Sequence, residues 1–441
     1  MSTRPATPLG PVLLTMGQRP VTQQQLAIAG MTVTGVLLFL IGFLVVGSGY
    51  SMLRPKFIGL SLHPYLLPVA VAFPLVLMSR MHMFPLRIGV SILVFVSTYC
   101  FSALNGGLNP LGEVFKVASA VISIIVCALL VRRRGDFVAG ALGLAIAVAA
   151  LGMRGLQPAQ MASGEIMDGA NKNSYSIFAL PAILLAGFIV LHFKTVPKIV
   201  KAALIVCILP ALAVIFMGGN RSGYLGAVIV GAMLFWDQRG KGLLLVGGIV
   251  AVVAVGIAEY GSTKILNERL KQTVEGNRSD NIRRDIVIAC AEIALENPII
   301  GVGPQRLPLE IANRLPYATV GYVEAHNVFA HVMAGSGLIC FGALLAAGWT
   351  LCTWRPRGGG TIGGKEDPLS QARKLMRMLI ILWIARGLFT PEIIYNPAFD
   401  ISIGLVIGYC MLADRAGAEA RLASPRSRPA PPALGGLAAS H

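Results

Sequence analysis

Long apolar runs separated by short polar or basic segments make up most of the chain. A helix needs roughly 20 apolar residues to cross the hydrocarbon core of a bilayer, and runs of this kind recur from residue 26 to residue 413. Only helices or closed barrels satisfy every backbone group in lipid, and the runs lack the alternation of barrel strands. The pattern therefore predicts an all-α, polytopic integral membrane protein with about 12 transmembrane helices. Their approximate cores are 26–46, 58–78, 85–104, 114–131, 137–152, 175–193, 199–217, 221–236, 242–258, 328–353, 375–390 and 398–413.

Composition agrees with this class, and the distribution of charge adds an orientation. The 441 residues are 55% hydrophobic and 13% charged, with a mean hydropathy of +0.72, which is too apolar for domains that must face water. The net charge of +17 would suit a nucleic-acid binder, but the Lys and Arg residues gather in alternate loops. These loops lie around 80–87, 132–134, 194–201, 239–241 and 355–377. By the positive-inside rule they and both termini face the cytoplasm, and no nucleic-acid partner is expected.

This orientation divides the chain into five parts. Residues 1–25 form a polar cytoplasmic segment without a signal-peptide pattern, so the first span is expected to be retained. Residues 26–258 hold transmembrane helices 1–9, residues 259–327 form one large outward segment, and residues 328–413 hold helices 10–12. Residues 414–441, rich in Pro, Gly and Ala, are predicted to be a disordered cytoplasmic tail.

The large outward segment is too long for a structureless loop and is expected to fold against the membrane. Residues 281–298 place Ile282, Ile286, Ala289 and Ile293 at helical spacing, which predicts an amphipathic helix that Pro298 ends. The following GVGPQR resembles part of a nucleotide-binding loop, but no βαβ pattern surrounds it, so we expect a turn. The Lys and Arg residues of this segment, Arg306 and Arg314 among them, would attract an anionic substrate.

Four arginines stand where a charge is costly or unusual. Arg221 lies in a tight outward turn between two apolar runs, among small residues that would let a ligand approach its planar guanidinium. Arg283 and Arg284 are adjacent on the predicted amphipathic helix, so they point about 100° apart and only one can face a ligand squarely. Arg386, near the outer end of the eleventh span, is either a substrate contact or part of a buried ion pair with Glu392 or Asp400.

A histidine at the outer mouth of the tenth span is the candidate general base. His326 is flanked by Glu324 and Asn327 at the boundary between water and lipid, where a base could meet a lipid-borne substrate. His331 is five residues further, about 140° around a helix, so the two do not form a paired metal site. No closely spaced outward carboxylates that would hold Mg²⁺ are found, so we expect neither a metal nor a cofactor.

These residues together resemble the O-antigen ligase and polymerase superfamily of bacterial envelope glycosyltransferases, and most closely its O-antigen ligases. An Arg in a tight outward turn is Arg221 in GNRSGYLGA, and an Arg fifteen residues before a Pro-x-x-Gly-x-Gly turn is Arg283 before PIIGVG. A His-Asn pair opens the helix after the large loop in AHNVFAHVMAGSGL. The first motif departs from the common Ser-Arg-Gly pattern, because it reads Asn220-Arg221-Ser222. In the second motif, Val287 stands four residues after Arg283, where a tryptophan is often found.

The resemblance implies transfer of a glycan from undecaprenyl pyrophosphate to lipid A-core at the periplasmic face of the bacterial inner membrane, without a metal. His326 would act as general base, and Arg221 and Arg283 would bind the pyrophosphate, with Arg284, Asn327 and Arg386 as further substrate contacts. The O-antigen polymerase and the protein O-oligosaccharyltransferase remain alternatives. A secondary transporter would also fit the number of spans, but such a protein usually carries its long loop inside, midway through the chain.

Overall fold

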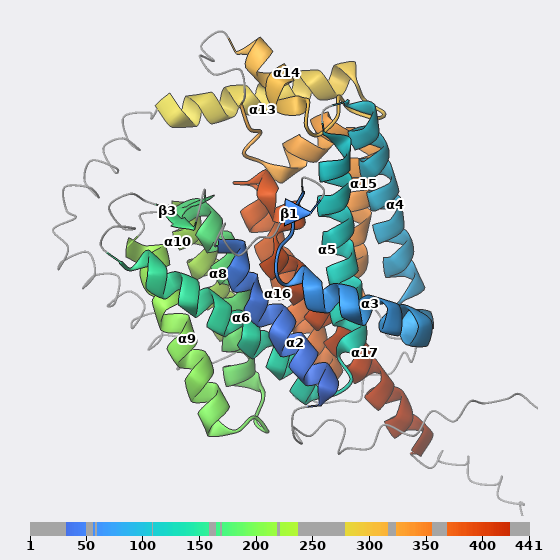
Figure 1. Cartoon of the computed structure of the whole chain (residues 1–441), viewed down its shortest axis with the longest axis vertical. Helices are drawn as coiled ribbons and strands as arrows, with labels where there is room; N and C mark the ends of the chain where they lie inside the picture. The colour runs from blue at the N-terminus through green and yellow to red at the C-terminus, as the bar shows by residue number, and fades with distance from the viewer. Residues whose placement is uncertain are drawn as a thin grey trace, which may run out of the picture.

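The computed structural model describes residues 32–49, 56–57, 60–107, 109–157, 165–167, 170–217, 221–236, 278–315, 323–354 and 368–423. The described chain is a helical bundle with two helices lying across one end (Figure 1). The helices are α2 (Val33–Phe43), α3 (Leu66–Arg80), α4 (Leu86–Asn105), α5 (Pro110–Leu130), α6 (Arg134–Gly155), α8 (Lys172–His192), α9 (Lys198–Met217), α10 (Arg221–Phe235), α13 (Arg278–Glu296), α14 (Leu307–Arg314), α15 (Val328–Cys352), α16 (Pro368–Gly387) and α17 (Pro397–Ala423).

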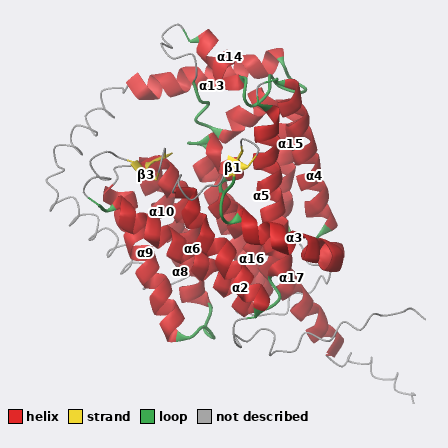
Figure 2. Cartoon of the chain, viewed as in Figure 1, coloured by secondary structure: helices red, strands yellow, loops and turns green. Residues whose placement is uncertain are grey.

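Short 3₁₀ helices and two small hairpins complete the described elements. The 3₁₀ helices are η1 (Leu44–Gly49), η3 (Met81–Met83) and η4 (Pro391–Tyr395). Strands β1 (Lys56–Phe57) and β2 (Leu60–Ser61) pair antiparallel, as do β3 (Glu165–Met167) and β4 (Ala170–Asn171), in loops between helices (Figure 2). The predicted all-α class is confirmed.

Eight of the described helices are long and apolar enough to cross a membrane. They are α3, α4, α5, α6, α8, α9, α15 and α17, while α2 with η1 and α10 are shorter apolar helices. Helix α16 coincides with the eleventh predicted span but carries several Arg and Lys residues. The ninth predicted span, 242–258, lies outside the described residues, so the total of twelve stays a prediction. Helix α17 continues to Ala423, past the predicted start of the tail at residue 414.

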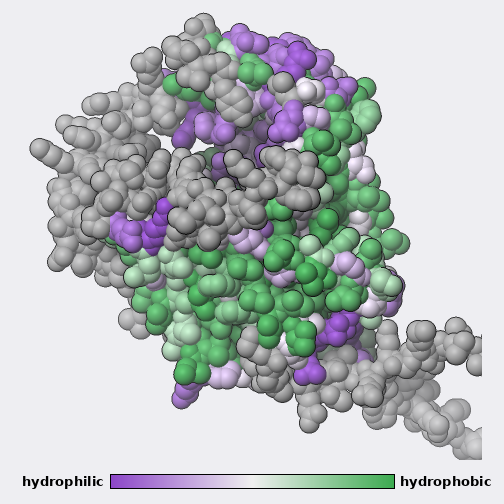
Figure 3. All heavy atoms as spheres, in the orientation of Figure 1, coloured by the Kyte–Doolittle hydropathy of each residue, from purple (hydrophilic) through white to green (hydrophobic). Residues whose placement is uncertain are grey.

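The outer surface of the bundle is apolar, which is the reverse of a water-soluble protein. Large side chains such as Met78, Ile199 and Leu67 are 88%, 79% and 74% exposed. Figure 3 shows this apolar surface on the face of the bundle in view, with hydrophilic residues over α13 and α14 at one end. Only lipid makes such a surface favourable, so the described helices are those of a multi-pass membrane protein.

Close helix packing inside the bundle depends on small residues. Helices α2 and α6 meet at Gly42, Gly140 and Gly143, where an added Cβ at Gly42 would come within 2.6 Å of the Gly140 carbonyl oxygen. Lipid gives apolar helices no hydrophobic drive toward one another, so their backbones must approach closely to gain van der Waals contact.

Helices α13 and α14 form a cap with its own small core. Ile286, Cys290 and Ile293 of α13 pack with Ile311 of α14 and with Ala330 near the start of α15. The predicted amphipathic helix over 281–298 is therefore confirmed, with its apolar face turned toward the bundle. Two ion pairs supplement this packing: Arg314 binds Glu296 with both terminal nitrogens, at 2.8 and 2.5 Å, and Arg306 binds Glu310 at 2.8 Å.

A turn after α13 joins this cap to a break in α15. Helix α15 is interrupted at Gly337, which has φ +80° and ψ 173°, so the carbonyls of Ala334 and Gly335 lose their usual helical partners. The amide of Val302 donates to the Ala334 oxygen at 3.1 Å. The Gly335 oxygen accepts from the Gly303 amide and from Ser102 Oγ of α4, each at 2.8 Å.

One hydrogen bond runs in the opposite direction, from α15 to the turn. The amide of Leu338 donates to the Pro298 oxygen at 2.7 Å instead of to a helical carbonyl. Non-helical backbone at membrane depth is stable only where its N–H and C=O groups find hydrogen-bond partners in the protein. The turn over residues 298–303 provides these partners. The predicted turn is thus present, and its function in the fold is to fasten α13 to α15.

Replacing Gly337 with Ala is expected to destabilise the protein by at least about 1–3 kcal/mol, since the backbone conformation there is nearly restricted to glycine. The added Cβ would also collide with the carbonyl oxygen of Ile299. Gly342→Ala in the same helix is the matched control, because nothing lies within 4 Å of its Cβ position. Thermal unfolding in detergent measures both variants, and equal transition temperatures would contradict the packing described.

Candidate functional site

His326 lies in a strained position directly before α15. Its φ is +49°, a left-handed conformation that costs a non-glycine residue on the order of 1 kcal/mol. The next residue, Asn327, caps the helix: its Oδ1 accepts from the amides of Phe329 at 2.8 Å and Ala330 at 3.1 Å. The cap fixes the chain direction and holds His326, which is exposed, at the mouth of α15.

The imidazole of His326 is within electrostatic reach of a cation and of an acid from two other elements. Partial removal of water lowers its pKa below the usual 6.5, and the positive charge of Arg283 on α13 lowers it further, while Glu392 on η4 opposes the shift. Arg283 is therefore the member of the arginine pair whose charge reaches His326; Arg284 is exposed beside it. The imidazole is neutral near pH 7 and able to accept a proton.

Glu392 connects this site to α8. Its carboxylate accepts from Ser174 Oγ at 3.2 Å. Burial, which removes water from the carboxylate, raises the pKa of Glu392, and the negative charge of Glu324 raises it further. The hydrogen bond from Ser174 and the charges of His326 and Lys116 act in the opposite direction. Four separate parts of the chain thus bring ionisable groups together at one end of the bundle, and α8 adds the hydroxyl of Ser174. Sequence reasoning considered Glu392 only as a partner for Arg386, because the turn that carries it gives no sign of where it will pack.

Arg221 is the first residue of α10, at the same end. Helices α8 and α10 run parallel, since Leu180 lies against Gly226 and Gly187 lies against Leu234 further along both helices. Their first residues therefore stand side by side. Arg221 begins its helix next to the start of α8, the part of α8 that contacts η4 through Glu392.

Arg386 lies deeper than the other predicted residues and is 1% exposed. Its Nη2 donates to Ser176 Oγ of α8 at 2.9 Å, and its Cδ would lie 3.3 Å from a Cβ at Gly226 of α10. Its Nε and Nη1 have no hydrogen-bond partner in the described chain, and within those residues it forms no ion pair with Glu392 or Asp400. The ion-pair alternative is therefore wrong for the described structure, and two buried guanidinium nitrogens have no hydrogen-bond partner there.

A second polar group, formed by Glu113, Lys116 and His331, was not predicted. Lys116 of α5 pairs with Glu113 at 2.7 Å and lies 5.3 Å from the centre of the Tyr395 ring. Glu113 also accepts from Tyr99 of α4 at 3.4 Å. His331 is buried within the electrostatic reach of Glu113 and Lys116. An acid and a base in the first turns of an apolar span were the signal that sequence analysis could have used.

The expectation that Arg306 and Arg314 attract an anionic substrate needs qualification. Arg306 and Arg314 are paired with carboxylates of the cap, so they contribute little net charge toward a substrate. Within the described residues, no group of three or more His, Cys, Asp or Glu side chains is placed to hold a metal ion.

Comparison with known families gives a match over this region. The family model described as O-antigen ligase matches residues 203–345, from α9 into α15. This match supports a relation to the O-antigen ligase and polymerase superfamily. A comparison with curated protein sequences gives no match.

The match covers the segment that carries Arg221, Arg283, Arg284, His326 and Asn327, and it confirms the predicted resemblance. The chain is thus a multi-pass membrane protein, and the match supports an O-antigen ligase or polymerase type of function. Arg386 and Glu392 lie outside the matched segment, and only the fold brings them to its residues.

The charges around His326 predict how two substitutions shift its pKa. Arg283→Gln removes the cation that disfavours the imidazolium, so the pKa of His326 should rise. Glu392→Gln removes the acid that favours it, so the pKa should fall further below 6.5. NMR titration of histidine-labelled protein, with the signal assigned through His326→Gln, measures both shifts. Arg284→Gln is the matched control, and a shift as large as that of Arg283→Gln would show that the other arginine faces the imidazole.

Proposed function

We propose that this protein is an O-antigen ligase, which moves a polysaccharide from undecaprenyl pyrophosphate to lipid A-core at the periplasmic face of the inner membrane. The observation that carries the proposal is that the charge of Arg283 acts on His326 at the bundle end where α10 begins with Arg221. All three residues lie in the segment that matches the O-antigen ligase model. A neutral base beside cations is what attack on a sugar pyrophosphate requires.

In the proposed reaction, a hydroxyl oxygen of the acceptor attacks the anomeric carbon of the first sugar of the donor glycan. The bond from that carbon to the pyrophosphate oxygen breaks, and its electron pair leaves with undecaprenyl pyrophosphate. The hydroxyl proton passes to the imidazole of His326, which later releases it to water. The lowered pKa of His326 keeps the imidazole in the form that can accept this proton.

Cationic groups would stabilise the leaving pyrophosphate. Arg221 and Arg283 are assigned to the phosphates because guanidinium groups bind phosphate oxygens in a bidentate manner. The first turns of α10 and α15 point their backbone N–H groups toward the same end, which adds favourable potential for an anion. Arg284 and Asn327 remain candidate substrate contacts, although the side-chain Oδ1 of Asn327 already accepts the two hydrogen bonds that cap α15.

Arg386 is proposed as a deeper contact for the lipid-linked phosphate. Its burial with two unpartnered nitrogens is costly in an apolar bundle, and an anionic ligand would offset that cost. No divalent metal is part of the proposed mechanism, since the arginines would neutralise the charge that a metal otherwise would.

Alternative assignments within the superfamily use the same chemistry with another acceptor. An O-antigen polymerase would extend a second lipid-linked glycan, and a protein O-oligosaccharyltransferase would modify a hydroxyl side chain. A secondary transporter would need neither a base nor a phosphate site.

The lipopolysaccharide of a deletion strain distinguishes these functions. Loss of a ligase should leave bare lipid A-core on a gel, because no polysaccharide is attached. Core carrying one repeat would instead identify a polymerase, and an unchanged ladder would identify a protein transferase or a transporter. Complementation with the wild-type gene should restore the full ladder.

His326→Ala should reduce turnover by about 10² to 10⁴ fold, the usual cost of losing a general acid or base. Binding of the lipid-linked donor should persist, because the arginines hold the pyrophosphate. His331→Gln is the control, since that side chain is buried in the second polar group, near Glu113 and Lys116, while His326 is exposed. Transfer by purified protein measures both, and wild-type turnover of a folded His326→Ala variant would contradict the assignment.

A further inference from the structure

Lys116 and Glu113 place two opposite charges in the first two turns of α5, which is otherwise an apolar span. Lys116 Nζ donates to Glu113 Oε1 at 2.7 Å, and the hydroxyl of Tyr99 on α4 donates to Oε2 at 3.4 Å. The side chain of Glu113 is 12% exposed, whereas that of Lys116 is 50% exposed. Ionisable residues inside a membrane span are costly and usually mark a functional site. The pair presents a partly exposed ammonium group that a carboxylate holds in place.

The short helix η4 connects this pair with the site around His326. Glu392 and Tyr395 are three positions apart on η4, and residues at this spacing in a 3₁₀ helix lie on the same side. The ammonium of Lys116 lies 5.3 Å from the centre of the Tyr395 ring, and its charge reaches Glu392. Glu392 in turn is within electrostatic reach of His326. The pair on α5 is thus a neighbour of the candidate base.

The charged groups at this end of the bundle divide by sign between different elements. Arg283 on α13 acts on His326, and Arg221 begins α10. On η4 and α5, by contrast, the carboxylates of Glu392 and Glu113 accompany a single ammonium. These carboxylates would repel a phosphate group, whereas a hydroxyl group can donate to a carboxylate and accept from an ammonium. The surface formed by η4 and α5 therefore suits an uncharged ligand that is rich in hydroxyl groups.

We propose that Lys116, Glu113 and the Tyr395 ring form the subsite for the accepting sugar, and that this sugar is uncharged. A hydroxyl group of the sugar accepts from a second N–H of the Lys116 ammonium, of whose three N–H groups one binds Glu113. The apolar C–H face of the sugar ring packs on Tyr395, which is partly exposed. His331 is buried near the pair, out of reach of the sugar, and is not part of the subsite. The inference rests on the proposed function, because it gives the acceptor of that reaction its place.

Kinetics with each substrate varied in turn test the subsite separately from donor binding. Lys116→Gln removes the ammonium and keeps a polar side chain. The KM for lipid A-core should rise about 10- to 100-fold, which is the usual effect of losing a hydrogen bond to a charged group. The KM for the lipid-linked donor should stay unchanged. Transfer by the purified full-length protein in detergent measures both values.

Two further variants serve as controls for this measurement. Lys116→Arg keeps the positive charge and the N–H donors, so it should retain most of the affinity for the acceptor. Lys198→Gln removes a lysine that is exposed at the start of α9, at the opposite end of the bundle, and should change neither KM.

Binding of a soluble oligosaccharide tests the subsite without the reaction. Core oligosaccharide is freed from lipid A by mild acid, and one portion is dephosphorylated with aqueous hydrofluoric acid. Saturation-transfer difference NMR with the full-length protein should show binding of the dephosphorylated portion to the wild type and to Lys116→Arg. The signal should be lost with Lys116→Gln.

The outcomes separate the subsite from the proposed function. An unchanged acceptor KM in a folded Lys116→Gln variant would overturn the subsite, as would an equal rise of the donor KM. Absence of oligosaccharide binding to the wild type, or binding that requires the phosphate groups, would overturn it as well. If the wild type transfers no glycan to lipid A-core, the proposed function is wrong, while loss of oligosaccharide binding in Lys116→Gln would still support the subsite.

Discussion

The backbone exchange between the turn at 298–303 and the broken helix α15 is the constraint on which the arrangement of the site depends. Two carbonyls and one amide freed at the break find partners in the turn and in Ser102 of α4. In a membrane, water does not compensate unpaired backbone groups, so the break and the turn require one another. Because the turn follows α13 and the break interrupts α15, this exchange fastens the helix that carries Arg283 to the helix that begins directly after His326.

The cap adds a second fixed point to this arrangement. Its small core joins α13 and α14 to the first turns of α15, and Asn327 directs the chain into that helix. The strained backbone of His326 is held between the cap core and the helix start. A base on a flexible loop would lose the geometry needed for proton transfer, whereas here both sides of the residue are packed.

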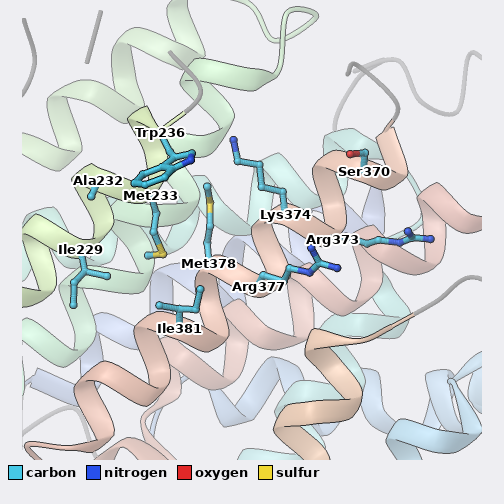
Figure 4. A pocket seen from close by; sticks show the side chains of 10 residues that line it. All are labelled: Ile229, Ala232, Met233, Trp236, Ser370, Arg373, Lys374, Arg377, Met378 and Ile381. Atoms are coloured by element: carbon cyan, nitrogen blue, oxygen red, sulfur yellow. The ribbon is translucent and has the colours of Figure 1, made fainter. Parts of the chain in front are cut away.

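Helices α10 and α16 connect the two ends of the molecule. At one end Arg386 is buried against α8 and α10, and at the other Arg373, Lys374 and Arg377 lie on the part of α16 that lines a groove with α10 (Figure 4). The same helix thus carries cations in two different environments. The buried one lies close to the proposed phosphate site, while the other three lie at the opposite end of the bundle.

The sequence by itself determined the class of fold, because apolar runs of bilayer length admit only helices, and it located α13, the following turn, and the residues Arg221, Arg283 and His326. Their spacing along the chain is a local property. Only the tertiary structure decided that Arg283, and not Arg284, acts on His326, that Glu392 and Ser174 join the site, and that Arg386 binds Ser176 instead of an acid. The hydrogen bonds of Ser176 with Arg386 and of Ser174 with Glu392 join residues 210 and 218 positions apart. The packing of helices in three dimensions, which no periodicity encodes, brings them together.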